Sequence, residues 1–247
     1  MKLKLISTAV AAFAAHMASS QAAIVVNTTY TDVAGATPTV SSNDLAATQF
    51  QSSSSTGTDA MGTARHAEMF NGTIGDAANA NTNATDWVRF GTTNTITLNL
   101  DISTNTLGYD ITGIDTIAGW IEGGGGRSDH GYSIELGFVG GGTATLINAQ
   151  YWAPNPSGEF WSVVSISNDG GGILNSDTVN NNGGGALADA NTLATGVQSI
   201  TWTITDAANP SIAAEFDVFG VATVPEPSST ALLGLGGLAL LLRRRRA

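Results

Sequence analysis

The chain has 247 residues, with 20 Asp and Glu against nine Lys and Arg, and it contains no cysteine. Such an acidic protein repels nucleic acid and anionic lipid, so a nucleic-acid-binding function is disfavoured. Because no disulfide is possible, stability must come from core burial, hydrogen bonds or bound ions.

The first 22 residues have the pattern of a secretory signal peptide. Lys2 and Lys4 form a positive start, and an apolar stretch from Leu5 to Ala18 follows, interrupted by His16. Small residues around Ala22 suit a cleavage site. Because the apolar stretch is short, a cleaved signal peptide is favoured over a retained helix.

The exported part of the chain is more acidic than the whole. Between residues 23 and 227, three arginines stand against twenty carboxylates, which gives a net charge of −17 with no lysine. The absence of lysine excludes phosphate-binding loops of the Walker type and Schiff-base chemistry. The negative charge also attracts divalent cations.

Residues 23–59 are expected to form a lead-in to the main domain. Residues 24–30 are rich in β-forming types and predict a first strand, whereas the Ser- and Thr-rich stretch 31–60 predicts a long loop. Residues 65–70 predict a short helical turn or strand, and Asn71-Gly72-Thr73 predicts a turn.

Residues 60–222 are expected to fold into one all-β domain. Apolar and polar residues alternate in several segments, as in half-buried strands. The expected strands cover residues 87–90, 95–102, 109–121, 132–138, 144–152, 160–167, 200–204 and 214–218. About eight strands at this spacing predict a jelly-roll sandwich. A β-helix is the disfavoured alternative, because the glycine clusters do not recur at a fixed period.

Residues 224–247 form a distinct C-terminal segment. Pro225-Glu226-Pro227 precedes an uncharged stretch from Ala231 to Leu242, and four arginines follow. Twelve helical residues would measure roughly 18 Å, less than the ~30 Å hydrocarbon core, so the helix inserts loosely. Arg243, Arg244, Arg245 and Arg246 would keep this end cytoplasmic. An ordinary C-terminal anchor is the simpler interpretation.

The order of tripeptide, apolar helix and arginine cluster resembles the PEP-CTERM sorting signal of Gram-negative, biofilm-forming bacteria. The resemblance implies recognition by an exosortase and the secretion machinery, with cleavage near Pro225, Glu226 and Pro227. The protein would be anchored transiently in the inner membrane and would end at the cell surface or in the extracellular matrix.

A second resemblance covers residues 60–221. Phe70-Asn71-Gly72, Tyr109-Asp110-Ile111-Thr112, Tyr132-Ser133-Ile134 and the segment from Ala214 to Gly220 occur in the order of discoidin-like, galactose-binding-like jelly rolls. That family often carries a structural calcium ion between an early loop and a glutamate near the last strand. The resemblance implies, as calcium ligands, Asn71, Thr73, Asp76 and Glu215. Alternatively, residues 71–72 are a plain turn and Glu215 faces solvent.

The same family binds glycans on loops at one end of the sandwich. Aromatic faces suit sugar C–H surfaces, and polar groups orient the hydroxyls. The candidates on loops are Tyr151, Trp152, Trp161, Arg127 and His130. The competing interpretations are that the tryptophans belong to the core, as expected for Trp87, Trp120 and Trp202, and that Arg127 pairs with a nearby carboxylate.

Catalysis has little support, and no enzyme activity is expected. The sequence has no Gly-x-Ser-x-Gly elbow. Glu215-Phe216-Asp217 resembles the start of a jelly-roll glucanase motif, but Gly220 stands where the second glutamate is needed. Two hypotheses remain: a module that binds extracellular polysaccharide, or a structural matrix protein whose polar faces are hydrated or glycosylated.

Overall fold

The computed structural model describes residues 21–22, 24–31, 38–58, 66–74, 88–120, 130–151, 160–168, 173–174, 179–182, 192–204 and 212–224. Residues 1–20 of the expected signal peptide and almost all of the sorting segment lie outside these ranges, and the last two residues of the expected signal peptide form β1 (Gln21–Ala22). In the ranges themselves, no helix is long and apolar enough to cross a membrane.

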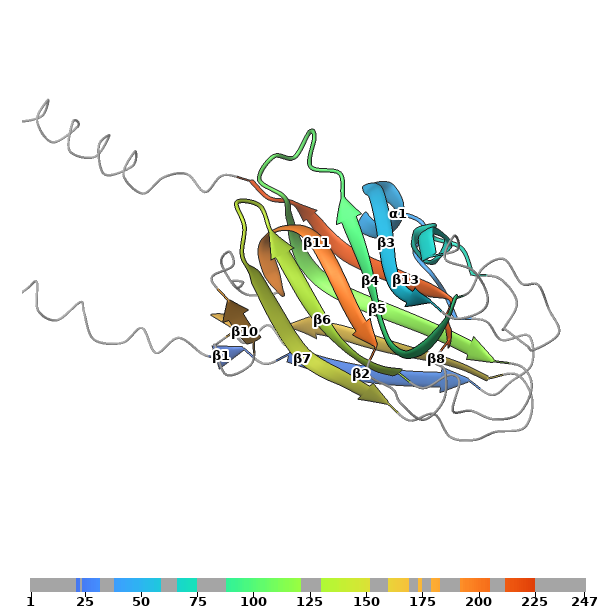
Figure 1. Cartoon of the computed structure of the whole chain (residues 1–247). Coiled ribbons are helices and arrows are strands. Elements are labelled where there is room, and N and C mark those ends of the chain that lie inside the picture. Colours follow the sequence, from blue (N-terminus) through green and yellow to red (C-terminus); the bar gives the residue numbers. More distant parts are fainter. Residues whose placement is uncertain are drawn as a thin grey trace, which may run out of the picture.

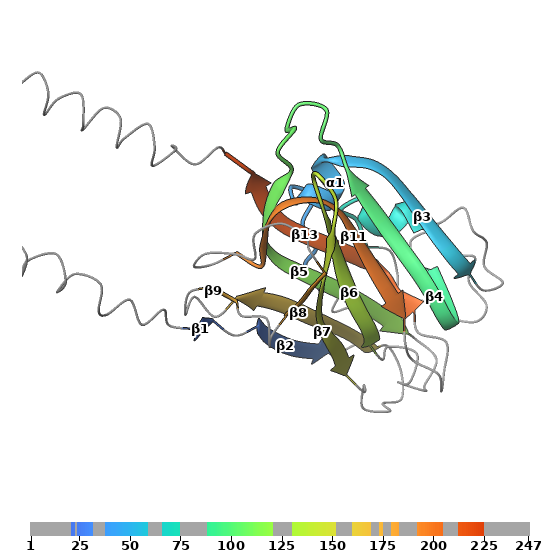
Figure 2. The same ribbon diagram turned by 60° about the vertical axis from the view of Figure 1, so that its left-hand side comes forward.

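Two layers of strands face each other (Figures 1 and 2). The first layer contains, in spatial order, β3 (Phe50–Thr58), β4 (Val88–Leu100), β11 (Ala194–Ile204), β6 (His130–Phe138), β7 (Thr143–Tyr151) and β10 (Val179–Asn182). The second layer contains β13 (Glu215–Ala222), β5 (Tyr109–Trp120), β8 (Phe160–Asn168) and β2 (Ile24–Thr31). Short pairings add β12 (Ile212–Ala213) against β4, and β1 (Gln21–Ala22) parallel to β9 (Ile173–Leu174).

Strand β11 joins the two layers. Its first residues pair with β5, and the remainder lies between β4 and β6. The register shifts around Gly196, whose φ of 77° is a backbone conformation that L side chains rarely adopt. This glycine bulge lets one strand pass from the second layer into the first, so the sheet folds over its own core.

The main core fills the space between the layers. Trp202 of β11 stacks on Phe216 of β13, with ring centroids 4.6 Å apart. Phe70 lies 5.8 Å from the first ring and 5.7 Å from the second, and it comes from the 3₁₀ helix η1 (His66–Phe70). Aromatic residues from both layers and from η1 therefore close the core together.

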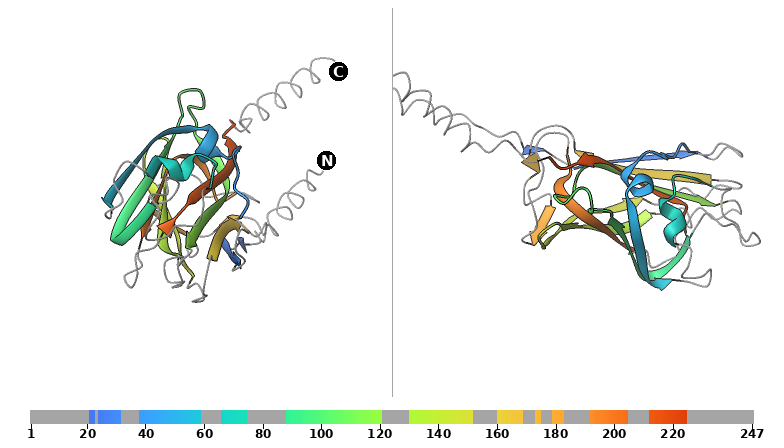
Figure 3. Two further views of the ribbon diagram at one scale, coloured as in Figure 1. Left: turned by 90° about the vertical axis from the view of Figure 1, so that its right-hand side faces the viewer. Right: turned by 90° about the horizontal axis from the view of Figure 1, so that it is seen from above.

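A smaller apolar cluster lies apart from this core. It contains Trp161, Ile117, Ile212 and Ala214, with Val40 and other partly buried residues packed against it. The short helix α1 (Leu45–Thr48) and η1 both contact β13, as the blue and teal segments in Figure 3 show. The segments before and after β3 thus cover the outer face of the last strand.

The all-β jelly-roll sandwich predicted from the sequence is confirmed, with nine strands of eight or more residues in the described ranges. The predicted loop over residues 31–60 is wrong, because β3 pairs with β4 along its length. Hydroxyl side chains suit this edge strand, since Thr56 bonds to Thr95 across the pair at 2.6 Å. Strands β2 and β3 also belong to the sheet, so the domain includes the expected lead-in.

Candidate functional site

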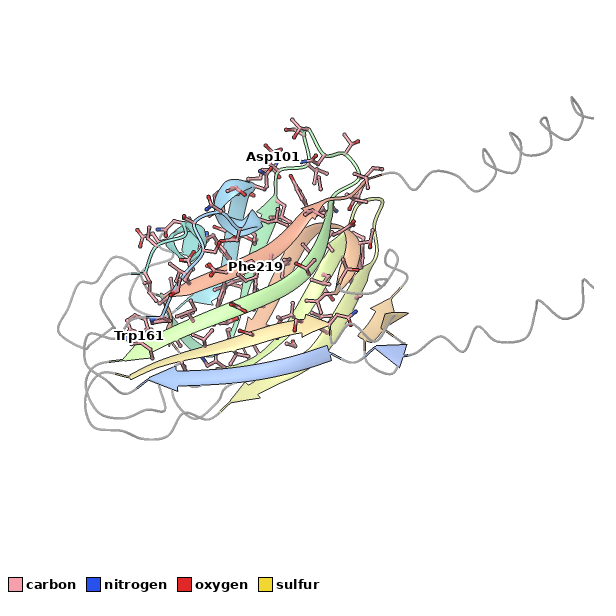
Figure 4. The ribbon with its side chains drawn as sticks, turned by 180° about the vertical axis from the view of Figure 1, so that it is seen from behind. Asp101, Trp161 and Phe219 are labelled. Atoms are coloured by element: carbon pink, nitrogen blue, oxygen red, sulfur yellow. The ribbon has the colours of Figure 1, made fainter. Side chains whose placement is uncertain are left out.

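The outer face of β13 carries two buried carboxylates. Phe216 and Val218 point into the main core, and the alternation of the strand places Glu215 and Asp217 on the opposite face. Phe219 lies across Gly113 of β5 and can be located in Figure 4. Loops before and after β3 cover Glu215 and Asp217, so both acidic side chains are removed from water.

Glu215 binds the turn that follows η1. Its Oε1 accepts a hydrogen bond from the backbone N–H of Gly72 at 2.8 Å. Gly72 has φ of 72°, and a Cβ at this position would lie 2.6 Å from the Cα of Ser42. Only glycine permits this close approach, so the sequence Asn71-Gly72 brings the turn against both Glu215 and the segment before α1.

The other expected calcium ligands are only partly placed. Asn71 and Thr73 are exposed, and Asn71 Oδ1 accepts bonds from Thr73 N at 2.8 Å and from Thr73 Oγ1 at 2.6 Å. Asp76 lies outside the described residues. Within those residues, no three His, Cys, Asp or Glu side chains are grouped to hold a metal ion. The turn at Gly72 therefore contacts Glu215. Without Asp76, the oxygen atoms of Asn71, Thr73 and Glu215 supply only part of the six to eight ligands that calcium takes.

Asp44 and Asp217 form a second contact between the N-terminal part and the last strand. Asp44 caps α1 by accepting from the N–H groups of Ala46 and Ala47, and it lies 3.4 Å from the N of Val218. Asp217 Oδ2 accepts from the N–H of Ser41 at 2.9 Å. We call the contacts made by Asp44, Glu215 and Asp217 the carboxylate clasp.

Burial makes the two aspartates of the clasp weaker acids. Burial raises the pKa of Asp217 to about 7, aided by the negative charges of Asp44 and Asp115 and by a carboxyl–carboxyl hydrogen bond with Asp44, and opposed by the Ser41 N–H. Asp115 lies opposite Asp217 in the register with β5. Burial also raises the pKa of Asp44 and of Asp115. Burial thus favours the protonated form of these carboxyl groups at a higher pH than for a solvated aspartate.

Three of the predicted glycan-contacting residues, His130, Tyr151 and Trp161, lie in strands and not on loops. Trp161 is the second residue of β8 and is buried in the smaller cluster, where a Cβ on Gly119 would lie 2.4 Å from its ring. His130 begins β6 and is buried, with Nε2 2.8 Å from Ser162 Oγ. Burial lowers the pKa of His130 to about 3, so it is neutral. The placement of His130 and Trp161 on exposed loops was wrong, because β6 begins two residues before the expected strand 132–138, and Trp161 lies inside the expected strand 160–167 with its side chain buried.

Of the remaining glycan candidates, the described residues include Tyr151, at the same end of the sandwich as His130. Tyr151 ends β7, next to His130 in the register with β6. Trp152 follows it directly and Arg127 precedes β6, and both lie outside the described residues. Trp161, labelled in Figure 4, lies at this end.

The last strand is fastened at its other end. Thr223 N donates to Gly108 O at 2.9 Å, and Thr223 Oγ1 donates to Asp110 Oδ1 and accepts from Gly196 N. Three segments distant in sequence thus meet at the residue where the domain passes into its C-terminal segment.

Comparison with known proteins identifies this C-terminal segment. Residues 223–246 match the family described as the PEP-CTERM protein-sorting motif. The motif confirms the sequence-based identification and marks the chain for export and membrane-associated sorting. It covers only the C-terminal segment and does not describe the sandwich. No curated protein matches the sequence.

Solved structures similar to the sandwich include carbohydrate-binding domains. A family 32 carbohydrate-binding module of C. perfringens NanJ, in complex with galactose, aligns with TM-score 0.37 and 13% identity over 68% of this chain and 91% of that one. The lectin domain of lectinolysin, complexed with Lewis B antigen, aligns with TM-score 0.39 and 12% identity over 73% of this chain and 98% of that one. A striped bass (Morone saxatilis) fucolectin aligns with TM-score 0.30 and 9% identity over 73% of this chain and 99% of that one. Similarity at this level does not transfer a function.

Sequence reasoning missed most of the carboxylate clasp. Asp44 stands directly before Leu45-Ala46-Ala47-Thr48, and an Asp before a short run of helix formers is a usable N-cap signal. Asp217 gave no such signal, because an acidic residue that alternates with apolar ones normally faces solvent. Its burial depends on a loop more than 170 residues away in sequence.

Proposed function

We propose that this chain is an exported protein, processed by an exosortase, whose sandwich binds carbohydrate at the cell surface or in the extracellular matrix. The observation that carries the proposal is the position of the sorting motif. The match begins at residue 223, directly after β13 ends at Ala222. The last strand of the folded domain is thus followed directly by the sorting motif.

The order of the discoidin-like sequence pieces supports a binding role for the sandwich. Tyr109–Thr112 opens β5, Tyr132–Ile134 lies in β6, and residues 215–220 form most of β13. The early turn at Gly72 contacts Glu215 of the last strand. The sequence pieces that carry the resemblance therefore lie in strands of one sandwich.

Exopolysaccharide is the proposed ligand, and the end marked by Tyr151 is the proposed binding surface. In sequence, Trp152 follows β7 directly and Arg127 precedes β6, and an aromatic ring and a guanidinium group are the kinds of stacking and hydrogen-bonding groups that sugars need. Trp161 and His130 support this end from within. They are not proposed as ligand contacts.

Binding of exopolysaccharide isolated from the producing cells tests this function. Saturable binding should weaken at least about tenfold in Trp152→Ala, because a stacked aromatic contact is lost. Val221→Ser, at the opposite end of the sandwich, is the matched control and should bind normally. Absence of saturable binding by the unmodified protein would contradict the proposal.

A structural matrix role is the second candidate. Ser52, Ser54 and Thr56 are exposed along the edge strand β3 and present hydroxyl groups to water. Such a surface suits hydration or the attachment of glycans to the protein itself. Mass spectrometry that finds attached sugars on a protein without glycan affinity would favour this role.

Calcium is proposed as a stabilising ion at the turn that contacts Glu215. The ligands would be Glu215, Asn71, Thr73 and Asp76, all oxygen donors of the kind calcium prefers. An ion that binds only the folded state at a hundred times its dissociation constant adds ~2.7 kcal/mol. The thermal midpoint should therefore fall in chelator, and Glu215→Ala should abolish the difference. An unchanged midpoint would remove calcium from the proposal.

A further inference from the structure

The exposed large apolar side chains of the described residues gather at one end of the sandwich. They are Phe50 (37% exposed), Leu107 (43%), Val221 (61%) and Val224 (72%). Phe50 begins β3, Leu107 lies between β4 and β5, and the two valines lie at the end of β13. We call this region, formed by residues 49–50, 101–108, 138–143, 192–197 and 220–224, the exit end.

Hydrogen bonds hold these segments together. Asp101 N donates to Gln49 O at 2.7 Å, which places Phe50 beside the loop that contains Leu107. Val139 N donates to Gly196 O at 2.9 Å, and Thr223 N donates to Gly108 O. The apolar residues therefore belong to one connected surface and are not scattered over the molecule.

The exit end has little of the charge carried by the rest of the domain. The exported chain has a net charge of −17, yet the five segments named above contain one charged residue, Asp101, and Asp110 borders them where it pairs with Val221 and accepts from Thr223 Oγ1. Hydrogen bonds to Ser103 lower the pKa of the Asp101 carboxyl, so it stays ionised. An acidic protein approaches a membrane with the least repulsion at such a surface.

The domain also begins and ends at this surface. The first residue of β2, Ile24, pairs with Asn168, whose side chain bonds to Thr192 O within the exit end. The last strand finishes there at Ala222. The start of β2 and the end of β13 both lie at the left of Figure 1.

The covalent tether limits how the domain can turn. Six residues, 225–230, separate Val224 from the apolar stretch 231–242, and six extended residues span about 20 Å at most. Strand β4 alone has 13 residues, which corresponds to about 43 Å. A domain held so closely cannot bring its opposite end to the membrane without lying flat.

We propose that the exit end rests against the phospholipid surface while the sorting segment is in the membrane. Phe50, Leu107, Val221 and Val224 contact the lipid interface, and the end marked by Tyr151 faces away. This inference rests on the proposed function, because it requires that residues 231–242 enter the bilayer. It assigns the sandwich a fixed orientation before processing, with its proposed carbohydrate surface directed outward.

Single-cysteine labelling tests the orientation, because the chain has no cysteine of its own. The full chain is reconstituted into phosphatidylcholine vesicles that carry a headgroup-attached quencher, with a fluorophore at Leu107→Cys, Val221→Cys or Thr56→Cys. Thr56 is the matched exposed control, six residues along β3 from Phe50, or about 20 Å farther from the exit end. Quenching at positions 107 and 221 should exceed that at 56 at least about twofold.

Two outcomes distinguish the inference from the proposed function. Equal quenching at all three positions, in a chain that floats with the vesicles, would overturn the orientation and leave the membrane tail intact. Flotation no better than that of a chain ending at Val224 would overturn the membrane tail, and the orientation with it. Adding Val221→Asp and Val224→Asp to Leu107→Cys should reduce quenching in a chain that still floats, and unchanged quenching would contradict the apolar contact.

Discussion

The two faces of β13 are both buried, but different interactions bury them. The inner face places Phe216 against Trp202 in an aromatic core between the layers. The outer face places Glu215 and Asp217 under two loops, where backbone N–H groups satisfy one oxygen of each. Apolar burial on one side is favourable in itself, whereas acidic burial on the other depends on each hydrogen bond.

This difference indicates what each face contributes. The inner face supplies the stability of the fold, since it removes large apolar surfaces from water. The outer face holds two covering segments in place, because the carboxylate clasp bonds the segment before β3 and the turn after η1 to β13. Substitutions on the two faces should therefore differ in size and in their response to pH.

The largest effect is expected from Trp202→Ala on the inner face. Removing a fully buried indole leaves a cavity beside Phe216 and Phe70, which costs about 3–5 kcal/mol of unfolding free energy. Urea unfolding followed by tyrosine fluorescence or circular dichroism measures the loss. Trp202→Phe keeps an aromatic ring in place and should lose clearly less; equal losses would argue against a packed core at this site.

A smaller effect is expected from the outer face in Glu215→Ala. The Gly72 N–H would lose its acceptor in a buried position, which costs about 1–3 kcal/mol. Glu215→Gln retains an oxygen acceptor and should recover part of the loss at constant calcium concentration. Hydrogen exchange at Gly72 offers a local readout, and protection that survives Glu215→Ala would refute the contact.

The smallest effect, and the one specific to the outer face, is a pH dependence. The folded-state pKa of Asp217 is raised to about 7 from an ordinary value near 3.8. Its protonation therefore stabilises the fold fully below pH ~3.8, and this contribution is lost as the pH rises through about 7.

Asp217→Asn should remove that slope. The amide keeps an acceptor for the Ser41 N–H but cannot ionise, so the variant should gain about 1 kcal/mol relative to the parent between pH 5 and pH 8. Thermal midpoints at both pH values measure this difference, with Asp101→Asn, a half-buried aspartate outside the clasp, as the control. A parent protein that is equally stable at the two pH values, like the variant, would contradict the raised pKa of Asp217.

Much of the inner face was predictable from the sequence. Alternation located β5, β6, β7 and β8 within a few residues, and Trp202 was correctly assigned to the core. The sorting segment was recognised because its three parts are contiguous. In each case the signal lies within one short stretch of chain.

The outer face was less predictable because its burial is non-local. Alternation shows that Glu215 and Asp217 oppose the core, but not that residues 38–44 and 71–74 cover them. The Ser-rich strand β3 was missed for a related reason, since its composition is that of a loop and only its pairing with β4 makes it a strand. His130 was misplaced because alternation did not reveal where β6 begins, and Trp161 was misplaced because its position in the expected strand did not show that its ring faces the smaller cluster.

The position of β13 also has a consequence for the timing of folding. This strand provides one neighbour of β5, the ring that stacks on Trp202, and both acceptors for the covering loops. During export, residues 215–222 emerge after the other strands of the described residues, so the sandwich has an unpaired edge and an open core until they emerge. Because the decisive contacts span most of the chain, folding should be slow and should finish only when the sorting motif reaches the membrane.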